Sequence, residues 1–318
     1  MPKTHDPPIR GEMRRVGFRR VSHGLFLTVR EGMSDDEELA RDLEAWLLVL
    51  PPGAVFTHVT GARLLGWRLP RLPEQVPVFA AVEEHQPRPR RSGLICSRLR
   101  RVTTPVPGLR FPVDRPEEIL LRASRDLGVL DVLIMLDDAL RKQHVTRASV
   151  AELVTSGRPG VRVLGKALQL ADPKSESAGE TVLRMFLQAI DVAVDSQAEL
   201  HDEHGQFVGR GDFVVKRTRK LFEFDGDVHR DMRQHRGDLR RDRRLVGAAY
   251  ERSGFSLDDL LNHPAPTMHE IDRLLERPHV SSRLTRWRRL VSGSLYAPDS
   301  RQRVMNRWRR AMGVTDWS

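Results

Sequence analysis

Residues 207–229, FVGRGDFVVKRTRKLFEFDGDVH, set the predicted architecture of the chain. Two runs rich in Val and Phe lie on either side of the polar residues 216–219, a pattern typical of a β-hairpin. An antiparallel register about that turn sets these residues opposite one another: Val215 and Lys220, Val214 and Leu221, Phe213 and Phe222, and Asp212 and Glu223. Because opposite side chains have Cβ atoms about 4.5–5.5 Å apart, two acids are predicted to lie face to face.

The acids of this hairpin predict a cation site. Like charges repel at that separation, and a fold that keeps them usually places a cation between them. Side chains alternate between the two faces of a strand, so Asp225 joins Asp212 and Glu223, and a short loop then leads to His229. Hard divalent ions such as Mg²⁺ bind oxygen ligands, often one or two carboxylates with water and substrate phosphate. The pattern therefore predicts a site that hydrolyses phosphodiesters.

The alternative interpretation is a solvated edge whose acids balance nearby Arg side chains. Phe213, Phe222 and Phe224 place apolar side chains on the opposite face of the hairpin. A hairpin that packs this face into a core holds its acids in defined positions, which favours a functional site.

A wider pattern accompanies the hairpin: a helix carrying Glu180, then Asp212, then Glu223 with the Asp-Gly and His229 that follow. With this order of acids, residues 175–262 resemble the PD-(D/E)XK nuclease superfamily. The branch that they resemble most is the one related to the very-short-patch mismatch repair endonuclease. The resemblance implies a restriction-endonuclease-like domain, with a mixed sheet flanked by helices.

The same resemblance implies roles for individual residues. Asp212, Glu223 and the carbonyl of Phe224 would hold Mg²⁺ or Mn²⁺, and Glu180 would complete the acidic cluster. His229 would assist the attacking water or the leaving oxygen.

The chain departs from the superfamily pattern in two places. Gly211 stands where the superfamily name has Pro, and Asp225 stands where a Lys normally stabilises charge on the scissile phosphate. In the mismatch-repair-like branch a His takes that place. Either His229 and an Arg such as Arg230 supply the positive charge, or the site binds metal without rapid turnover.

Glu180 has a second interpretation as a helix-capping residue. Ser177 followed three residues later by Glu180 fits the capping box, in which the Glu side chain reaches back to the Ser N–H. Apolar residues recur at helical spacing after it and predict a helix over 178–191. Capping and catalysis both remain open for Glu180 at this point.

The net charge of +10 and the isoelectric point near 10.6 favour a polyanionic partner, most simply DNA. An Arg-rich run follows the acidic hairpin, and a helix there would line the approach to the site with phosphate-binding side chains. The candidate nucleic-acid-binding residues are Arg230, Arg240, Arg241, Arg243 and Arg244. A solvated helix with intrahelical Arg–Asp pairs is the alternative.

The C-terminal residues repeat the tetrapeptide RWRR, at 286–289 and 307–310. Trp287 and Trp308 could stack on bases beside their Arg neighbours, or two amphipathic helices could dock them onto the nuclease-like core. Docking is favoured, because large aromatic side chains dominate core energetics.

The N-terminal half predicts a small α/β domain, with two short strands around residues 22–24 followed by helices and further strands. Through THVTGARLLGWRLP at 57–70 and the helical pattern of 115–142, it resembles the domain of abortive-infection-type antitoxins. That resemblance implies a protein partner of toxin–antitoxin or defence type. The winged helix-turn-helix that usually comes first has at most its wing here.

Size and composition favour a cytoplasmic protein of several domains. The expected domains are 1–172, 173–265 and 266–318, the last being an Arg- and Trp-rich helical tail. Cys96 is the single cysteine, which excludes a disulfide framework. The best apolar run, 127–136, is far shorter than the ~18 residues of a membrane span.

The sequence thus predicts a Mg²⁺- or Mn²⁺-dependent DNA endonuclease that acts in repair, defence or mobile-element control. The rival hypothesis is a nucleic-acid-binding or antitoxin-like regulator whose nuclease-like domain is catalytically weak.

Overall fold

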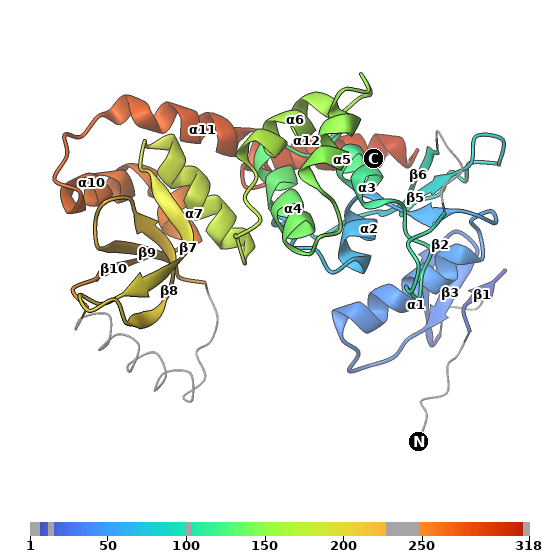
Figure 1. Ribbon diagram of the computed structural model, residues 1–318. Helices are drawn as coiled ribbons and strands as arrows, with labels where there is room; N and C mark the ends of the chain where they lie inside the picture. The colour runs from blue at the N-terminus through green and yellow to red at the C-terminus, as the bar shows by residue number, and fades with distance from the viewer. Residues whose placement is uncertain (1–6, 12–15, 100–103, 227–247, 314–318) are drawn as a thin grey trace. The chain divides into compact units, whose positions relative to one another are not determined.

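The computed structural model describes residues 7–11, 16–99, 104–226 and 248–313 (Figure 1). Over these residues the chain is an α/β protein in which helices flank one four-stranded mixed sheet and two three-stranded sheets, so the predicted α/β class is confirmed. Along this described part of the chain, no helix is long and apolar enough to cross a membrane.

The chain divides into two compact units that differ from the predicted domain ranges. The first unit consists of Met1–Trp67, Leu72–Asp126 and Arg301–Ser318, and the second of Arg68–Arg71 and Leu127–Ser300. The boundary expected at 172–175 therefore lies inside the second unit. The expected tail, 266–318, is divided between the two units.

Two three-stranded sheets build the first unit. The antiparallel sheet has the order β1-β3-β2, formed by Ile9–Arg10, Leu25–Thr28 and Phe18–Ser22. The other has the order β4-β5-β6, formed by Val55–Phe56, Val78–Val82 and Leu94–Arg98, with β6 parallel to β5. The helices are α1 (Asp35–Leu47), α2 (His58–Leu64), α3 (Pro116–Ala123) and the larger part of α12 (Pro298–Ala311).

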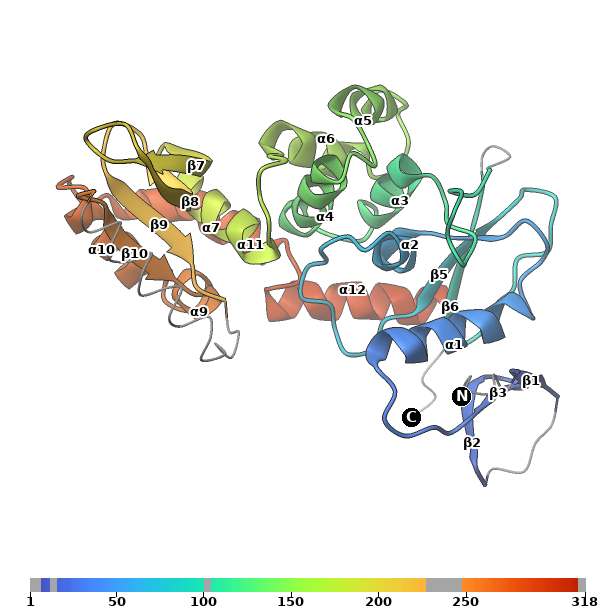
Figure 2. The ribbon, with the colours of Figure 1, turned by 60° about the horizontal axis from the view of Figure 1, so that its bottom comes forward.

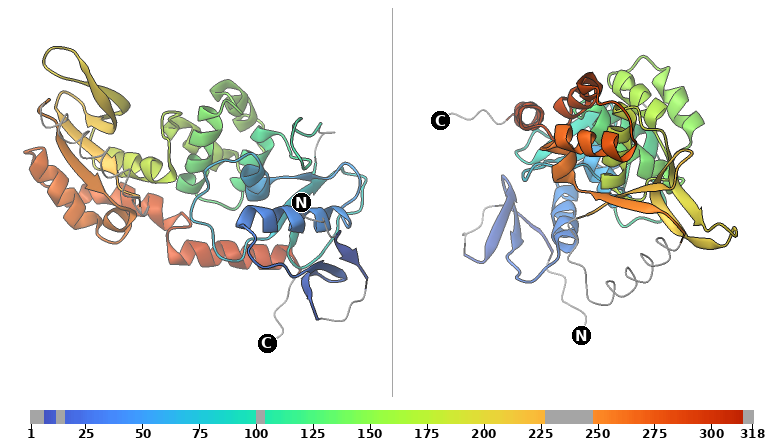
Figure 3. Two further views of the ribbon diagram at one scale, coloured as in Figure 1. Left: turned by 90° about the horizontal axis from the view of Figure 1, so that it is seen from below. Right: turned by 90° about the vertical axis from the view of Figure 1, so that its left-hand side faces the viewer.

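The hairpin predicted around residues 22–24 is confirmed as β2 and β3. Gly24 has a φ of +64°, a left-handed conformation that glycine adopts without the steric penalty of a Cβ. Helix α1 packs on β3 (Figure 3), and Trp46 of α1 is buried in a cluster with Leu25 and Phe56. Apolar burial of this kind, about 25 cal/mol per Å², holds the sheets and α1 together.

The second unit contains the mixed sheet, of order β10-β9-β8-β7 (Figures 1 and 2). Its strands are β7 (Val194–His201), β8 (Phe207–Val215), β9 (Lys220–Phe224) and β10 (Glu251–Phe255). Neighbours β7, β8 and β9 are antiparallel, whereas β10 runs parallel to β9. The helices are α4 (Val129–Arg141), α5 (Arg147–Val154), α6 (Val161–Leu170), α7 (Ala178–Ala189), α9 (Leu257–Leu261), α10 (Pro264–Leu274), the 3₁₀ helix η1 (Ser281–Arg283) and α11 (Leu284–Ser292).

The predicted hairpin register is confirmed for two of its four pairs, Phe213 with Phe222 and Val214 with Leu221. The predicted pairing of Asp212 with Glu223 lies just beyond the observed ladder and stays a prediction. Phe213 and Phe222 are buried, as expected for the apolar face. Helix α7 approaches this sheet so closely at Gly179 that a Cβ there would lie 2.0 Å from the ring of Phe224. Glycine at this position therefore lets α7 pack against β9.

Both tryptophans of the repeated RWRR are buried, but in different units. Trp287 of α11 donates its Nε1–H to the carbonyl of Leu260 at 2.8 Å and packs edge-on to Phe186 of α7. Trp308 of α12 packs edge-on to Phe79 of β5. Docking onto the nuclease-like half is thus wrong for Trp308, because the two copies lie on separate helices and α12 buries its apolar side in the first unit.

Candidate active site

Strands β8 and β9 bring acidic side chains to one face of the mixed sheet. Alternation along the strands places Asp212 on the face of Val214, and Glu223 on the face of its partner Leu221. The carboxylate of Asp212 reaches across to β9, where its Oδ2 accepts the N–H of Phe224 at 3.0 Å. Glu223 is buried, Asp212 half-buried and Asp225 more open to solvent. The strands therefore carry Asp212, Glu223 and Asp225 on one face of the sheet, the acidic face.

Glu180 enters the same neighbourhood from the first turn of α7. Its Oε2 accepts the Nε2–H of Gln197 at 2.9 Å, and the same amide nitrogen lies 3.4 Å from Oδ1 of Asp212. Gln197 has a φ of +49°, a conformation that is uncommon for a side chain larger than glycine and tends to occur at functional sites. The amide of Gln197 thus links the helix acid to the strand acid.

The capping interpretation of Glu180 is only half met. Ser177 is the N-cap of α7, and its hydroxyl accepts the N–H of Glu180 at 3.0 Å. The carboxylate of Glu180 accepts instead the N–H of Glu176 at 2.8 Å, together with the amide of Gln197. Glu180 therefore stabilises the helix start while its carboxylate lies beside the strand acids.

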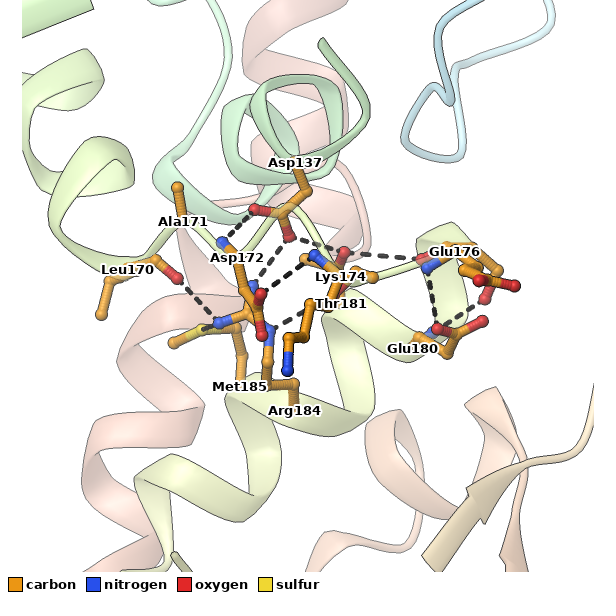
Figure 4. A network of polar contacts seen from close by, with 12 residues as sticks. Asp137, Leu170, Ala171, Asp172, Lys174, Glu176, Glu180, Thr181, Arg184 and Met185 are labelled. Carbon is orange, nitrogen blue, oxygen red and sulfur yellow. Dashed lines mark hydrogen bonds and ion pairs between the residues drawn. The ribbon is translucent and has the colours of Figure 1, made fainter. Parts of the chain in front are cut away.

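A buried ion pair fixes the first turns of α7 (Figure 4). Asp137 of α4 accepts the hydroxyl hydrogen of Thr181 at 2.9 Å and an Nη2–H of Arg184 at 2.7 Å. Arg184 also donates to the carbonyl of Leu170 at 2.7 Å. Burial raises the pKa of Asp137 to about 6, although Arg184 opposes the shift. This network sets the orientation of α7 and, through it, the position of Glu180.

Arg252 of β10 is a site residue that the sequence did not reveal. Its Nε–H contacts Oε2 of Glu223, and its Nη2 lies 3.8 Å from Oδ1 of Asp225. In the parallel register Arg252 pairs with Leu221 and Gly254 with Glu223, so the guanidinium belongs to the acidic face. Only the pairing of β10 with β9 could have indicated this contact, because nothing local in ERSGF does.

Gly254 makes room for this arrangement. A Cβ at that position would lie 1.8 Å from Oδ2 of Asp225, so any larger residue would require the carboxylate of Asp225 to move. The carboxylate of Asp225 therefore folds over the backbone of β10 beside Arg252. Strand β10 thus contributes a cation, Arg252, and leaves space for the side chain of Asp225 at Gly254.

Several predicted residues lie outside the described residues. They are His229, Arg230, Arg240, Arg241, Arg243 and Arg244. Their predicted roles stay as predictions.

The acidic face offers carboxylate oxygens, the kind of ligand that a divalent ion such as Mg²⁺ binds. Among the described residues, no group of three or more His, Cys, Asp or Glu side chains is arranged to hold a metal ion. Mg²⁺ needs fewer, because it commonly binds through one or two carboxylates and keeps several waters. Asp212 and Glu223, with the nearby carbonyl of Phe224, fit that requirement by their chemistry. Comparisons with protein-family models, curated proteins and solved structures find no match for this chain.

Proposed function

We propose that the chain is a metal-dependent DNA endonuclease that hydrolyses phosphodiester bonds. The observation that carries the proposal is the acidic face itself, where Asp212 and Glu223 lie on paired strands and Gln197 connects Asp212 to Glu180. Acids at the positions of Asp212 and Glu223 are the two acids in the name of the PD-(D/E)XK superfamily, whose Pro and Lys this chain replaces with Gly211 and Asp225.

The order of elements supports a restriction-endonuclease-like fold for this part of the chain. Helix α7 precedes the antiparallel strands β7, β8 and β9, and β10 then adds in parallel beside β9. This order places the acids of β8 and β9 near the middle of the sheet, where neighbours on both sides hold them in position.

In the proposed reaction Asp212, Glu223 and the carbonyl of Phe224 would hold Mg²⁺ or Mn²⁺. A divalent ion in such a site generates a nucleophilic water and stabilises charge on the phosphoryl group. Glu180 and Gln197 orient the carboxylate of Asp212. His229 handles the proton of the attacking water or of the leaving oxygen, and Asp225 completes the acidic face.

DNA is the proposed partner, because the chain has a net charge of +10. The cytoplasm is the proposed setting, because Cys96 is the single cysteine of the chain. The first unit is proposed to bind a protein of toxin–antitoxin or defence type. The second candidate function is a regulator with a catalytically weak nuclease-like domain. Asp225 in place of Lys, with Glu223 already engaged by Arg252, favours that candidate.

The test is incubation of the purified chain with supercoiled, linear, mismatched and single-stranded DNA in Mg²⁺ or Mn²⁺. Cleavage is expected, and it should disappear with a chelator and in Glu223→Gln, since the amide keeps the shape and removes the charge. Glu251→Gln is the matched control, because Glu251 is an exposed acid of β10 that pairs with Lys220. DNA binding without cleavage of any substrate, unchanged in Glu223→Gln, would support the regulator instead.

His229 gives a second arm to the same experiment. His229→Ala is expected to slow cleavage by about 10²–10⁴-fold, the usual contribution of general acid–base catalysis, with DNA affinity retained. Wild-type rates in His229→Ala would remove this residue from the mechanism.

A further inference from the structure

We propose that Arg252 is the phosphate-binding cation of this site, in place of the Lys that Asp225 replaces, and that it exchanges from Glu223 to the scissile phosphate when metal and DNA bind. The inference rests on the proposed function and adds to it a residue from β10. Arg252 would bind two anions in turn, first the carboxylate of Glu223 and then the scissile phosphate.

The position of Arg252 in β10 brings its guanidinium to the acidic side chains of β9. Parallel pairing with β9 places it on the face of Glu223, and its guanidinium contacts both Glu223 and Asp225. The side chain of Glu223 is 6% exposed and that of Arg252 is 30% exposed. The guanidinium is therefore the more accessible member of the pair and the one that an incoming phosphate could reach.

The guanidinium of Arg252 is chemically suited to bind a phosphate. The planar guanidinium stays charged at all working pH values and can donate two parallel hydrogen bonds to a phosphate. Beside Glu223 the guanidinium could bind a phosphate held at the acidic face. A Lys at position 225 would project from β9 into the same place, and the gap left by Gly254 lets Asp225 turn towards Arg252 instead.

A divalent ion at this site would compete with Arg252 for the carboxylate of Glu223. A divalent ion that binds Oε2 of Glu223 competes with the Nε–H of Arg252 for the same oxygen. Once displaced from Glu223, the guanidinium still has Asp225 at 3.8 Å on one side and can turn its Nε–H towards the scissile phosphate. Arg252 should therefore weaken metal binding in the absence of DNA and accelerate cleavage in its presence.

Two measurements with opposite expected signs test this inference. Arg252→Met should bind Mg²⁺ more tightly than the wild type in calorimetry without DNA. It should also cleave DNA about 10²–10³-fold more slowly in single turnovers at saturating Mg²⁺, the usual effect of removing one donor to a charged transition state. Arg252→Lys keeps the charge without the planar fork, and its rate should lie between the two.

The matched control is Lys220→Met, which removes a cation of β9 that pairs with Glu251. It should change neither the metal affinity nor the cleavage rate. Thermal unfolding of each variant establishes that the protein is folded, and Arg252→Gln is the second substitution if Arg252→Met unfolds.

The outcomes separate this inference from the proposed function. If the wild type cleaves and folded Arg252 variants cleave equally fast, Arg252 is only a structural counter-ion and the inference is overturned while the nuclease proposal stands. Slower cleavage with weaker metal binding would also overturn the exchange. If the wild type cleaves no DNA, both proposals fail.

Discussion

The first unit and the acidic face of the second unit use charged side chains in opposite ways. In the first unit, Arg122 donates its Nε–H to Asp114 at 3.1 Å, and the two side chains are 4% and 0% exposed. Thr57 also donates to Asp114, at 2.9 Å. On the acidic face Glu223 is only 6% exposed, but the groups around it are more open: Arg252 is 30% and Asp225 43% exposed.

Solvent exposure limits what each set of charges can do. A buried pair that is fully hydrogen-bonded cannot exchange partners without breaking the fold, so Asp114 and Arg122 hold α3 beside the β4-β5-β6 sheet. Charges that remain partly open to water can exchange one partner for a ligand. Substitutions of Asp114 or Arg122 should therefore change stability, whereas substitutions on the acidic face should change activity.

The strongest effect should be on activity at the acidic face. Asp212→Asn should lower the cleavage rate by about 10²–10³-fold or more and weaken Mg²⁺ binding, because the variant has one charged ligand fewer. Its free energy of unfolding should stay close to that of the wild type, since the amide oxygen can still accept the N–H of Phe224. Calorimetry and single-turnover cleavage check both. Unchanged metal affinity would remove Asp212 from the metal site.

The next effect is on stability in the first unit. Asp114→Ala removes the nearer carboxylate partner of buried Arg122 and leaves only that of Glu118, at 3.7 Å. Breaking such a buried pair lowers the free energy of unfolding by about 3–5 kcal/mol. Cleavage per folded molecule should stay unchanged. Chemical denaturation followed by circular dichroism measures the decrease. A drop in activity of the folded variant would contradict the division of roles between the two regions.

Asp137 combines the two roles, because it is a buried charge that supports the acidic face. Its pKa rises from 3.8 in the unfolded chain to about 6 in the folded protein. Between these two pH values the folded state holds the proton more tightly. Stability should therefore fall as the pH rises from about 4 to about 6, by about 3 kcal/mol for a shift of about two units.

Asp137→Asn is the matched variant for this titration, since it lacks the ionising group. Denaturation curves at several pH values should show its stability changing less over that window than the wild type. Parallel pH profiles of the two proteins would mean that Asp137 does not titrate there.

The weakest effect should be on DNA affinity rather than on catalysis. Neutralising Arg240, Arg241, Arg243 and Arg244 together should flatten the dependence of DNA affinity on salt. The log–log slope should decrease by close to one unit for each phosphate that these side chains neutralise in the wild type. The measurement is fluorescence anisotropy over a range of salt concentrations. An unchanged slope would identify these side chains as ordinary solvated surface.

Short-range patterns predicted much of the second unit. The period of two fixed the pairing of Phe213 with Phe222, and the helix expected over 178–191 is observed as Ala178–Ala189 with Ser177 at its N-cap. These features depend on residues close in the chain, whose side chains meet in any fold that forms the hairpin or the helix. Such local patterns do not predict which distant strand or helix an element packs against.

The acidic hairpin, the capped helix that carries Glu180 and the basic character of the chain all follow from the order of residues alone. The link from Glu180 through Gln197 to Asp212 does not, and neither does the contact of Arg252 with Glu223 across the parallel pairing of β10 with β9. Both depend on tertiary structure, and the physical reason is sequence separation. Local periodicity sets which face a side chain occupies, whereas the contact between distant elements depends on the packing of the whole sheet.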